Sequence, residues 1–166
     1  TMEILLVSPL KPGVIIIGKV LPYLLLAFIN ALTVLVLAIT VFNIPFKGSF
    51  LLLFFETVLF ILTALSLGIL ISTIAKTQQT AMMIALAGLL MPTMLLSGFV
   101  FPIENMPLIL QIISNLIPAK WFLIIIKGIM LKGVSLEYFW VETLILAGMM
   151  LVFLLAALKN FKTRLE

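Results

Sequence analysis

Apolar residues are grouped in long runs that short polar segments separate. Four of these runs are long enough to cross a hydrocarbon core of about 30 Å, which takes about 20 helical residues. Turn-forming residues such as Asn43 and Pro45 follow the first run, and the polar stretch 76–79 follows the second. Pro92 predicts a kink within the third. The pattern therefore predicts an all-α integral membrane protein with about four transmembrane helices, at residues 20–42, 50–74, 80–100 and 138–158.

The stretch between the third and last spans, residues 101–134, is also apolar, but Pro102, Pro107 and Pro118 divide it. The two resulting blocks, 108–117 and 121–131, are each too short to span a bilayer. We expect them to form an outer re-entrant helical hairpin. Such a hairpin is either a simple surface feature or a plug that gates a pathway.

The opening segment, residues 1–12, is apolar but only about half as long as a membrane span. Pro9, Pro12 and Gly13 mark its end. A short helix that lies along the cytoplasmic face of the membrane fits this segment best.

Lysine and arginine positions test the topology, since cytoplasmic loops carry an excess of them. With residues 1–19 in the cytoplasm, four spans put six basic residues inside and four outside. A fifth span at 107–131 would place four on each side of the membrane. The four-span topology, with a cytoplasmic C-terminus, is therefore favoured, although three lysines of the outer segment oppose it: Lys120, Lys127 and Lys132.

Composition narrows the class of protein. Hydrophobic residues make up 64% of the chain and charged residues 10%, whereas soluble domains are about half apolar and about a quarter charged. The chain contains no Cys, His or Asp. This excludes disulfides, zinc sites built on Cys or His, and nucleophiles activated by His. We therefore expect no metal site and no catalytic residue, and the scattered basic residues give no patch for nucleic acid.

A phosphate-loop spacing occurs at residues 13–19, where Gly13 and Gly18-Lys19 frame four apolar residues. The pattern fails at Val20, where a Ser or Thr should reach the magnesium ion. The segment is better explained as the cytoplasmic entrance of a transmembrane helix, with Lys19 extending toward the headgroups.

Glu56 is the only acid well within a predicted span. Because a charge in hydrocarbon is costly, such residues usually face a protein interior or a wet cavity. Thr63 lies seven residues later on the same helical face, so the pair is a candidate polar contact in a pathway. The alternative is that Glu56 simply lies near the outer headgroups.

Small residues recur at every fourth position in Ala64, Gly68 and Ser72, which allows another helix to approach closely. This predicts helix packing, either within the chain or in a dimer. The chain has nine methionines, and we expect those of the third span to be packing residues, with an adaptable substrate wall as the less favoured interpretation.

The segment 96–107 ends the third span. Gly98 and Pro102 break the helix, Glu104 and Asn105 form a polar turn, and Pro107 begins the next short helix.

Three segments of the chain resemble the permease subunits of ABC-2 type exporters, in particular bacterial multidrug-efflux permeases. Residues 1–9 are similar to the family's coupling segment, 70–79 to its loop after the fourth helix, and 96–107 to its signature past the fifth. The resemblance implies that the chain is the C-terminal portion of such a permease, lacking the first two helices and the external domain.

The same resemblance implies partners and roles. A second permease subunit and cytoplasmic ABC ATPase subunits would assemble with the chain in the bacterial inner membrane. ATP and magnesium would bind to the ATPase, with no cofactor on this chain. A hydrophobic drug-like or lipid-like substrate would be exported. The resemblance assigns ATPase coupling to Glu3, Leu5, Leu6, Ser8 and Pro9, and an outer gate to Ser97, Gly98, Phe99, Pro102, Glu104 and Pro107.

Two other functions fit the residues without an ATPase. A channel or secondary transporter would use polar groups or broken helices at the middle of the membrane. A membrane scaffold subunit would have no transport role.

Overall fold

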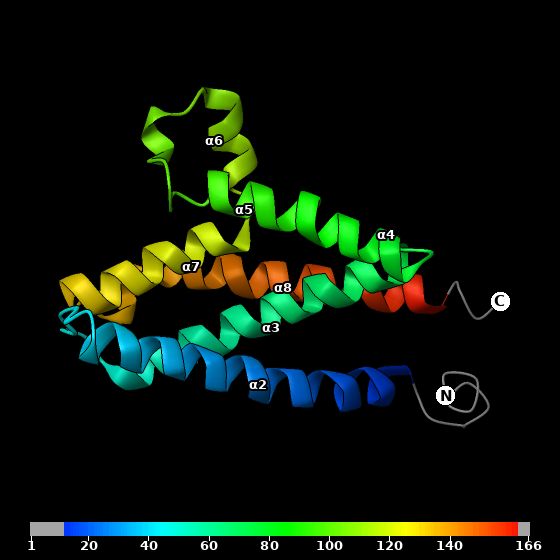
Figure 1. Cartoon of the computed structure of the whole chain (residues 1–166), viewed down its shortest axis with the longest axis horizontal. Coiled ribbons are helices and arrows are strands. Elements are labelled where there is room, and N and C mark those ends of the chain that lie inside the picture. The colour runs from blue at the N-terminus through cyan, green and yellow to red at the C-terminus, as the bar shows by residue number, and fades with distance from the viewer. Residues whose placement is uncertain (1–11, 163–166) are drawn as a thin grey trace.

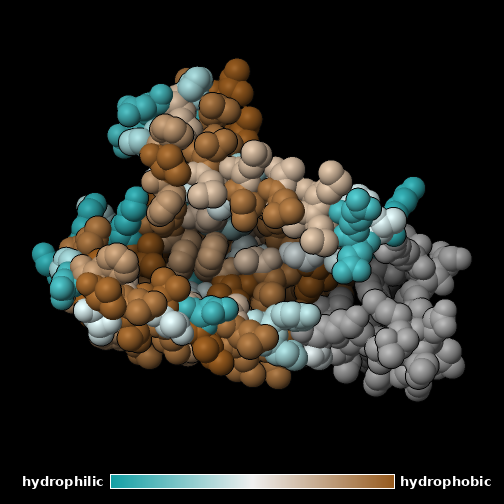
Figure 2. Space-filling view, in the orientation of Figure 1, coloured by the Kyte–Doolittle hydropathy of each residue, from teal (hydrophilic) through white to brown (hydrophobic). Residues whose placement is uncertain are grey.

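The computed structural model describes residues 12–162, and within them the chain is helical and contains no strand. Four helices are long and apolar enough to cross a membrane, over Val20–Thr40, Phe50–Ile74, Gln78–Leu96 and Trp140–Asn160. The prediction of an all-α membrane protein with about four transmembrane helices is confirmed. Apolar side chains cover the flanks of the molecule, while polar ones gather at its two ends and around the lobe that carries α6 (Figure 2).

The first span belongs to α2, Pro12–Thr40, which begins eight residues before the predicted start. Pro22 lies inside this helix without ending it. The hydroxyls of Thr33 and Thr40 each donate to the carbonyl four residues earlier, at 2.8 and 2.7 Å. These bonds satisfy polar groups that the surrounding hydrocarbon cannot.

The second span is α3, Phe50–Ile74, as predicted. The third combines α4 (Gln78–Met83), η1 (Ile84–Leu90) and α5 (Met91–Leu96). Thr77 caps its start by accepting a hydrogen bond from the Thr80 amide at 3.1 Å. The η1 segment has the wider π-type turns, with the Met91 amide bonded to the Leu86 carbonyl, just before Pro92.

The third span ends at Leu96, four residues before the predicted end at 100. Gly98 has a φ of 81°, which is left-handed backbone that stops a right-handed helix. Because residues 99–101 are also apolar, hydropathy alone predicted the end of this span too late.

The segment after the third span contains η2 (Ile103–Asn105), α6 (Leu108–Ser114), α7 (Pro118–Lys127), η3 (Gly128–Lys132) and η4 (Leu136–Tyr138). The α6 helix and the continuous α7–η3 helix meet at a bend of 83°, so the pair is either one broken span or a re-entrant loop. The last span, α8 (Trp140–Lys162), begins two residues later than predicted because residues 136–138 form a 3₁₀ turn.

The long helices run between two opposite ends of the molecule (Figure 1). At the α2–α3 end, the Lys47 amide donates to the Met130 carbonyl at 3.0 Å, which ties the α2–α3 loop to η3. The start of α2, the α3–α4 link and the last turns of α8 lie toward the other end, named here the α3–α4 end. This arrangement agrees with an even number of crossings.

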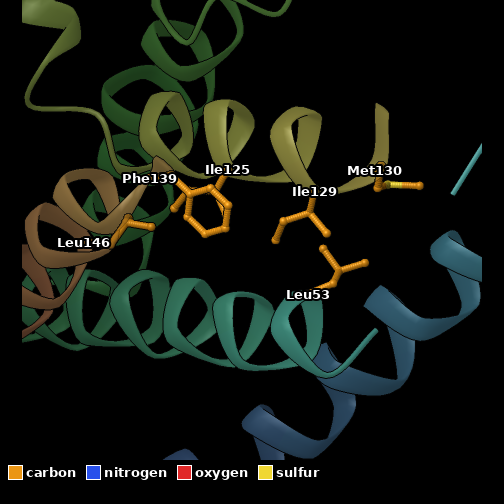
Figure 3. Packing of buried hydrophobic residues seen from close by; sticks show 6 residues of the cluster. All are labelled: Leu53, Ile125, Ile129, Met130, Phe139 and Leu146. Atoms are coloured by element: carbon orange, nitrogen blue, oxygen red, sulfur yellow. The ribbon is translucent and has the colours of Figure 1, made fainter. Parts of the chain in front are cut away.

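The core lies toward the α2–α3 end, where α3, α7–η3 and α8 meet (Figure 3). Its buried residues are Leu53, Ile125, Ile129, Met130, Phe139 and Leu146. Phe60 of α3 stacks on Phe122 of α7 with ring centroids 4.3 Å apart, which extends the core along α3.

Candidate functional site

Polar residues of α3 face α8 along one buried strip. Glu56, Thr63 and Ser66 are 2%, 0% and 6% exposed, although they lie within a span that is otherwise almost wholly apolar. Their spacing of seven and then three residues places them on one helical face. The structure therefore brings Glu56 and Thr63 together on the α8 side of α3, as the sequence predicted.

Glu56 has one hydrogen-bond partner. The hydroxyl of Thr143 on α8 donates to Glu56 Oε1 at 2.8 Å, and it also lies 3.1 Å from the Phe139 carbonyl. The other carboxyl oxygen, Oε2, is buried without a partner. Glu56 is thus buried between α3 and α8, and both its role in a pathway and its level relative to the outer headgroups stay predictions.

Thr63 and Ser66 are satisfied by backbone carbonyls. Thr63 donates to Leu59 O at 2.8 Å and lies 3.4 Å from the Leu146 carbonyl of α8, while Ser66 donates to Leu62 O at 2.8 Å. These hydroxyls favour close packing of α3 against α8 and leave little capacity for a ligand.

The small-residue stripe lies on a different face of α3. Ala64, Gly68 and Ser72 are all exposed, and a Cβ added at Gly68 would meet nothing within 4 Å. Within the described residues, therefore, no helix packs on the stripe, and of the two predicted uses only contact with another chain or segment remains.

The helix that contains α4, η1 and α5 has no buried residue. Met82, Met83, Met91 and Met94 are between 49% and 65% exposed. Within the described residues these methionines have little packing, because only a narrow side of this helix touches α3, α6 and α7. Whether they pack against a partner or form a substrate wall stays a prediction.

The segment 97–107 folds into a tight turn. Ser97 is buried, and the left-handed Gly98 brings the backbone so close to Ile103 that an added Cβ would lie 3.2 Å from its side chain. Pro102 precedes η2, which contains the exposed Glu104, and Pro107 is the N-cap of α6. Phe99 is exposed. The predicted helix break is confirmed, and a gating role for these residues stays a prediction.

The corner between α6 and α7 is built around Lys120. Its ammonium group donates to Ser114 Oγ at 3.2 Å and to Asn115 Oδ1, and it lies 5.0 Å from the centre of the Trp121 ring. The indole of Trp121 in turn donates to the Asn115 carbonyl at 3.0 Å. Lys120 thus has a local structural role in the 83° bend, which helps to explain a lysine in a segment predicted to lie outside.

An apolar hollow of about 500 Å³, named here the α2–α7 groove, lies between α2, α3 and α7–η3. Its walls include Phe28, Ala31 and Leu35 of α2, Phe54 of α3, and Ile126 and Met130 of α7–η3. Every residue that lines the groove is apolar except Asn30 and Thr57, and none of them is ionisable.

The predicted coupling residues, Glu3, Leu5, Leu6, Ser8 and Pro9, lie outside the described residues. The neighbouring stretch 13–19 is described and is part of α2. Because a phosphate loop needs non-helical backbone amides around an anion, this segment is not one. Within residues 12–162, no three potential metal-ligating side chains lie together.

The sequence did not point to Thr143 as the partner of Glu56, because 87 residues separate them. A threonine on an apolar span was the only signal available. The Lys120–Ser114 contact was missed for a related reason: both residues belong to helices whose relative angle no hydropathy pattern gives.

The family model for the ABC-2 type transporter matches residues 1–131 of the chain. Among curated proteins, the chain is 43% identical over 140 residues to the probable multidrug ABC transporter permease YbhR of Escherichia coli, an alignment that covers 84% of the chain and 38% of YbhR. It is 35% identical over 133 residues to the probable multidrug ABC transporter permease YbhS of the same species, with 80% and 35% covered.

A third relative, the inner membrane transport permease YhhJ of E. coli, is 29% identical over 164 residues, which is 98% of the chain and 43% of YhhJ. The chain thus spans roughly two fifths of the length of these relatives, with 38%, 35% and 43% covered. No solved structure matches it. The match to the family model, which extends over most of these helices, shows that the chain belongs to the ABC-2 type transporter family.

Proposed function

We propose that the chain is the C-terminal part of the membrane-spanning permease of an ATP-driven exporter, which moves a hydrophobic drug-like or lipid-like substrate out of the cell. Membership of the ABC-2 type transporter family supports this proposal. The structural observation that carries it is the third span, Gln78–Leu96, which is apolar along its length but, like the first span Val20–Thr40, has no residue buried within the described chain.

Lipid can cover a helix that is apolar all round, but a permease also needs a face for its partner and its substrate, and we assign that face to this span. In a permease made of two halves, that face meets the second permease subunit and the substrate between them. The exposed methionines of this span suit both roles, since their flexible thioethers adapt to ligands of different shape.

The energy source belongs to a partner. ATP and magnesium would bind to a separate cytoplasmic ATPase subunit, which would be in contact with residues 3–9. When ATP closes the ATPase dimer, its two states would contact this segment differently, and that difference would shift the helices that follow it. The hairpin from Ser97 to Lys132 would then cap the pathway on the outer side.

The proposed orientation puts residues 1–12, the α3–α4 link and the C-terminus in the cytoplasm. The basic residues Lys76 and Lys159 lie toward this end in the described part of the chain, as the positive-inside rule expects. A reporter tag placed after Lys162 tests the orientation: access only from the inside supports it, and access from outside would exclude four spans with an inner N-terminus.

Co-purification tests the coupling. The permease that contains this chain is solubilised in detergent and captured, and its ATPase subunit is identified. We expect a Gly/Ser replacement of residues 3–9 to abolish ATPase association and transport. The matched control is a Gly/Ser replacement of residues 163–166, which would keep both. Full ATPase association after replacement of 3–9 would contradict the coupling role, and transport without any ATPase would favour a secondary transporter.

A further inference from the structure

The α2–α7 groove has the dimensions of a lipid tail site. It follows α2 from Ala27 to Ala38, which is about 16 Å along a helix and close to half of a hydrocarbon core of about 30 Å. Its volume of about 500 Å³ is enclosed by aromatic and aliphatic side chains. Its depth and apolarity favour a flexible hydrocarbon chain over a polar solute.

One end of the groove reaches the α2–α3 end of the molecule. Phe50 and Met130 line it there, and the Met130 carbonyl accepts the Lys47 amide hydrogen at 3.0 Å. An acyl chain that enters from this end would therefore carry its headgroup to the level of the α2–α3 loop.

Lys47 lies at this end of the groove, where its amide reaches Met130, and Lys132 lies close by, next to Gly133, which lines the separate hollow beside Phe55. The backbone of Lys47 lies against Gly133, whose added Cβ would be 3.1 Å from Lys47 Cβ, so Lys47 and Lys132 are neighbours across the two loops. Both side chains are exposed. Ammonium groups at headgroup level, above a hydrocarbon slot, match a lipid with an anionic phosphate.

We propose that the α2–α7 groove holds one acyl chain of an anionic glycerophospholipid from the leaflet at the α2–α3 end, with the lipid phosphate beside Lys47 and Lys132. The site is separate from the proposed substrate surface on the third span, and its occupancy requires neither ATP nor an ATPase. It also gives a reason for two lysines at the end of the molecule where the positive-inside rule disfavours them.

Two adjacent phenylalanines provide a matched pair of reporters. Phe54 lines the groove, where its ring meets Phe28 edge-on at 4.8 Å, whereas Phe55 faces a separate hollow. They differ in depth by only about 1.5 Å. Both native tryptophans, Trp121 and Trp140, are replaced by Phe, and a single tryptophan is introduced as Phe54→Trp or Phe55→Trp.

The purified chain is reconstituted in phosphatidylcholine vesicles that contain a minor fraction of dibrominated lipid, which quenches nearby tryptophan. We expect brominated phosphatidylglycerol to quench the Phe54→Trp probe at a lower fraction than brominated phosphatidylcholine. The Phe55→Trp probe should show a weaker preference, because its hollow of about 300 Å³ is smaller than the groove. The preference should fall about fivefold for each lysine removed in Lys47→Gln and Lys132→Gln. A Lys76→Gln/Lys159→Gln variant, changed at the opposite end, should keep it.

Equal quenching of both probes without headgroup preference would overturn the proposal, because it describes ordinary boundary lipid. Absence of quenching at Phe54→Trp alone would also overturn it, since protein would then cover the groove. Native mass spectrometry of the unaltered chain gives an independent measurement: retention of phosphatidylglycerol over phosphatidylcholine, reduced by Ala31→Phe in the groove wall, supports the site, and equal retention contradicts it. Loss of transport activity has no bearing on either measurement.

Discussion

The second and third spans have similar compositions but opposite surroundings. In α3, Leu53, Glu56, Ile61, Thr63 and Ser66 are buried, mainly against α8 and also against α2 and α7. The helix Gln78–Leu96 has no buried residue, although its apolar character also suffices for a span. Because lipid is as apolar as leucine, hydropathy gives no reason for one helix to be buried and the other exposed.

Polar side chains mark the difference. The α3 helix carries a carboxylate and two hydroxyls on the strip that faces α8, and two of these groups reach α8 atoms. The third span has no comparable buried group. Polar contacts therefore join α3 to α8, whereas no buried polar group joins the third span to the other described helices.

The largest expected effect is in the core that contains α3. Ile125→Ala removes a fully buried side chain between α7, α3 and α8. We expect the free energy of unfolding to fall by about 2 kcal/mol, which is at the low end for truncation of a core residue. The loss is small because the side chain moves from a protein core into lipid or detergent on unfolding, and not into water. Denaturation in mixed micelles measures it. Leu90→Ala on the third span, where Leu90 is 54% exposed, is the control and should change stability little. Equal losses would show that the two regions do not differ.

The sequence predicted the spans well because length and apolarity suffice to locate them. An error arose where apolar residues continue past a backbone break, as after Gly98. Glu56 and Thr63 were correctly placed on one face by periodicity. Helical periodicity gives the face on which a residue lies but not which helix packs there. It therefore could not predict the partners of Glu56 and Thr63 on α8, or the exposure of the stripe around Gly68.

A second prediction concerns the Glu56–Thr143 contact. Thr143→Val leaves both carboxyl oxygens of Glu56 buried without a partner, so we expect a loss of about 1–3 kcal/mol. In a Glu56→Leu background the same change should cost little, because the hydrogen bond no longer exists. A double-mutant cycle in mixed micelles measures the coupling. A cost of Thr143→Val that is the same in both backgrounds would mean that the hydroxyl acts mainly on the Phe139 carbonyl.

The smallest expected effect is at Gly68, which is best compared with Gly48. A Cβ at Gly48 would lie 2.4 Å from the Ile129 carbonyl oxygen, whereas one at Gly68 meets nothing within 4 Å. Gly48→Ala should therefore destabilise the chain by about 1–3 kcal/mol through overpacking. Gly68→Ala should stabilise the isolated chain by up to about 1 kcal/mol, because alanine is the better helix former.

Whether Gly68→Ala raises or lowers the free energy of unfolding depends on what covers the stripe of Ala64, Gly68 and Ser72. If a helix of a partner or of another segment packs closely there, the added methyl group will obstruct it, and Gly68→Ala will destabilise the assembled permease while still stabilising the isolated chain. Unfolding measured on both forms separates these effects. Stabilisation of equal size in both would mean that the stripe faces lipid in the assembled permease, and that the two halves of the permease meet at another surface.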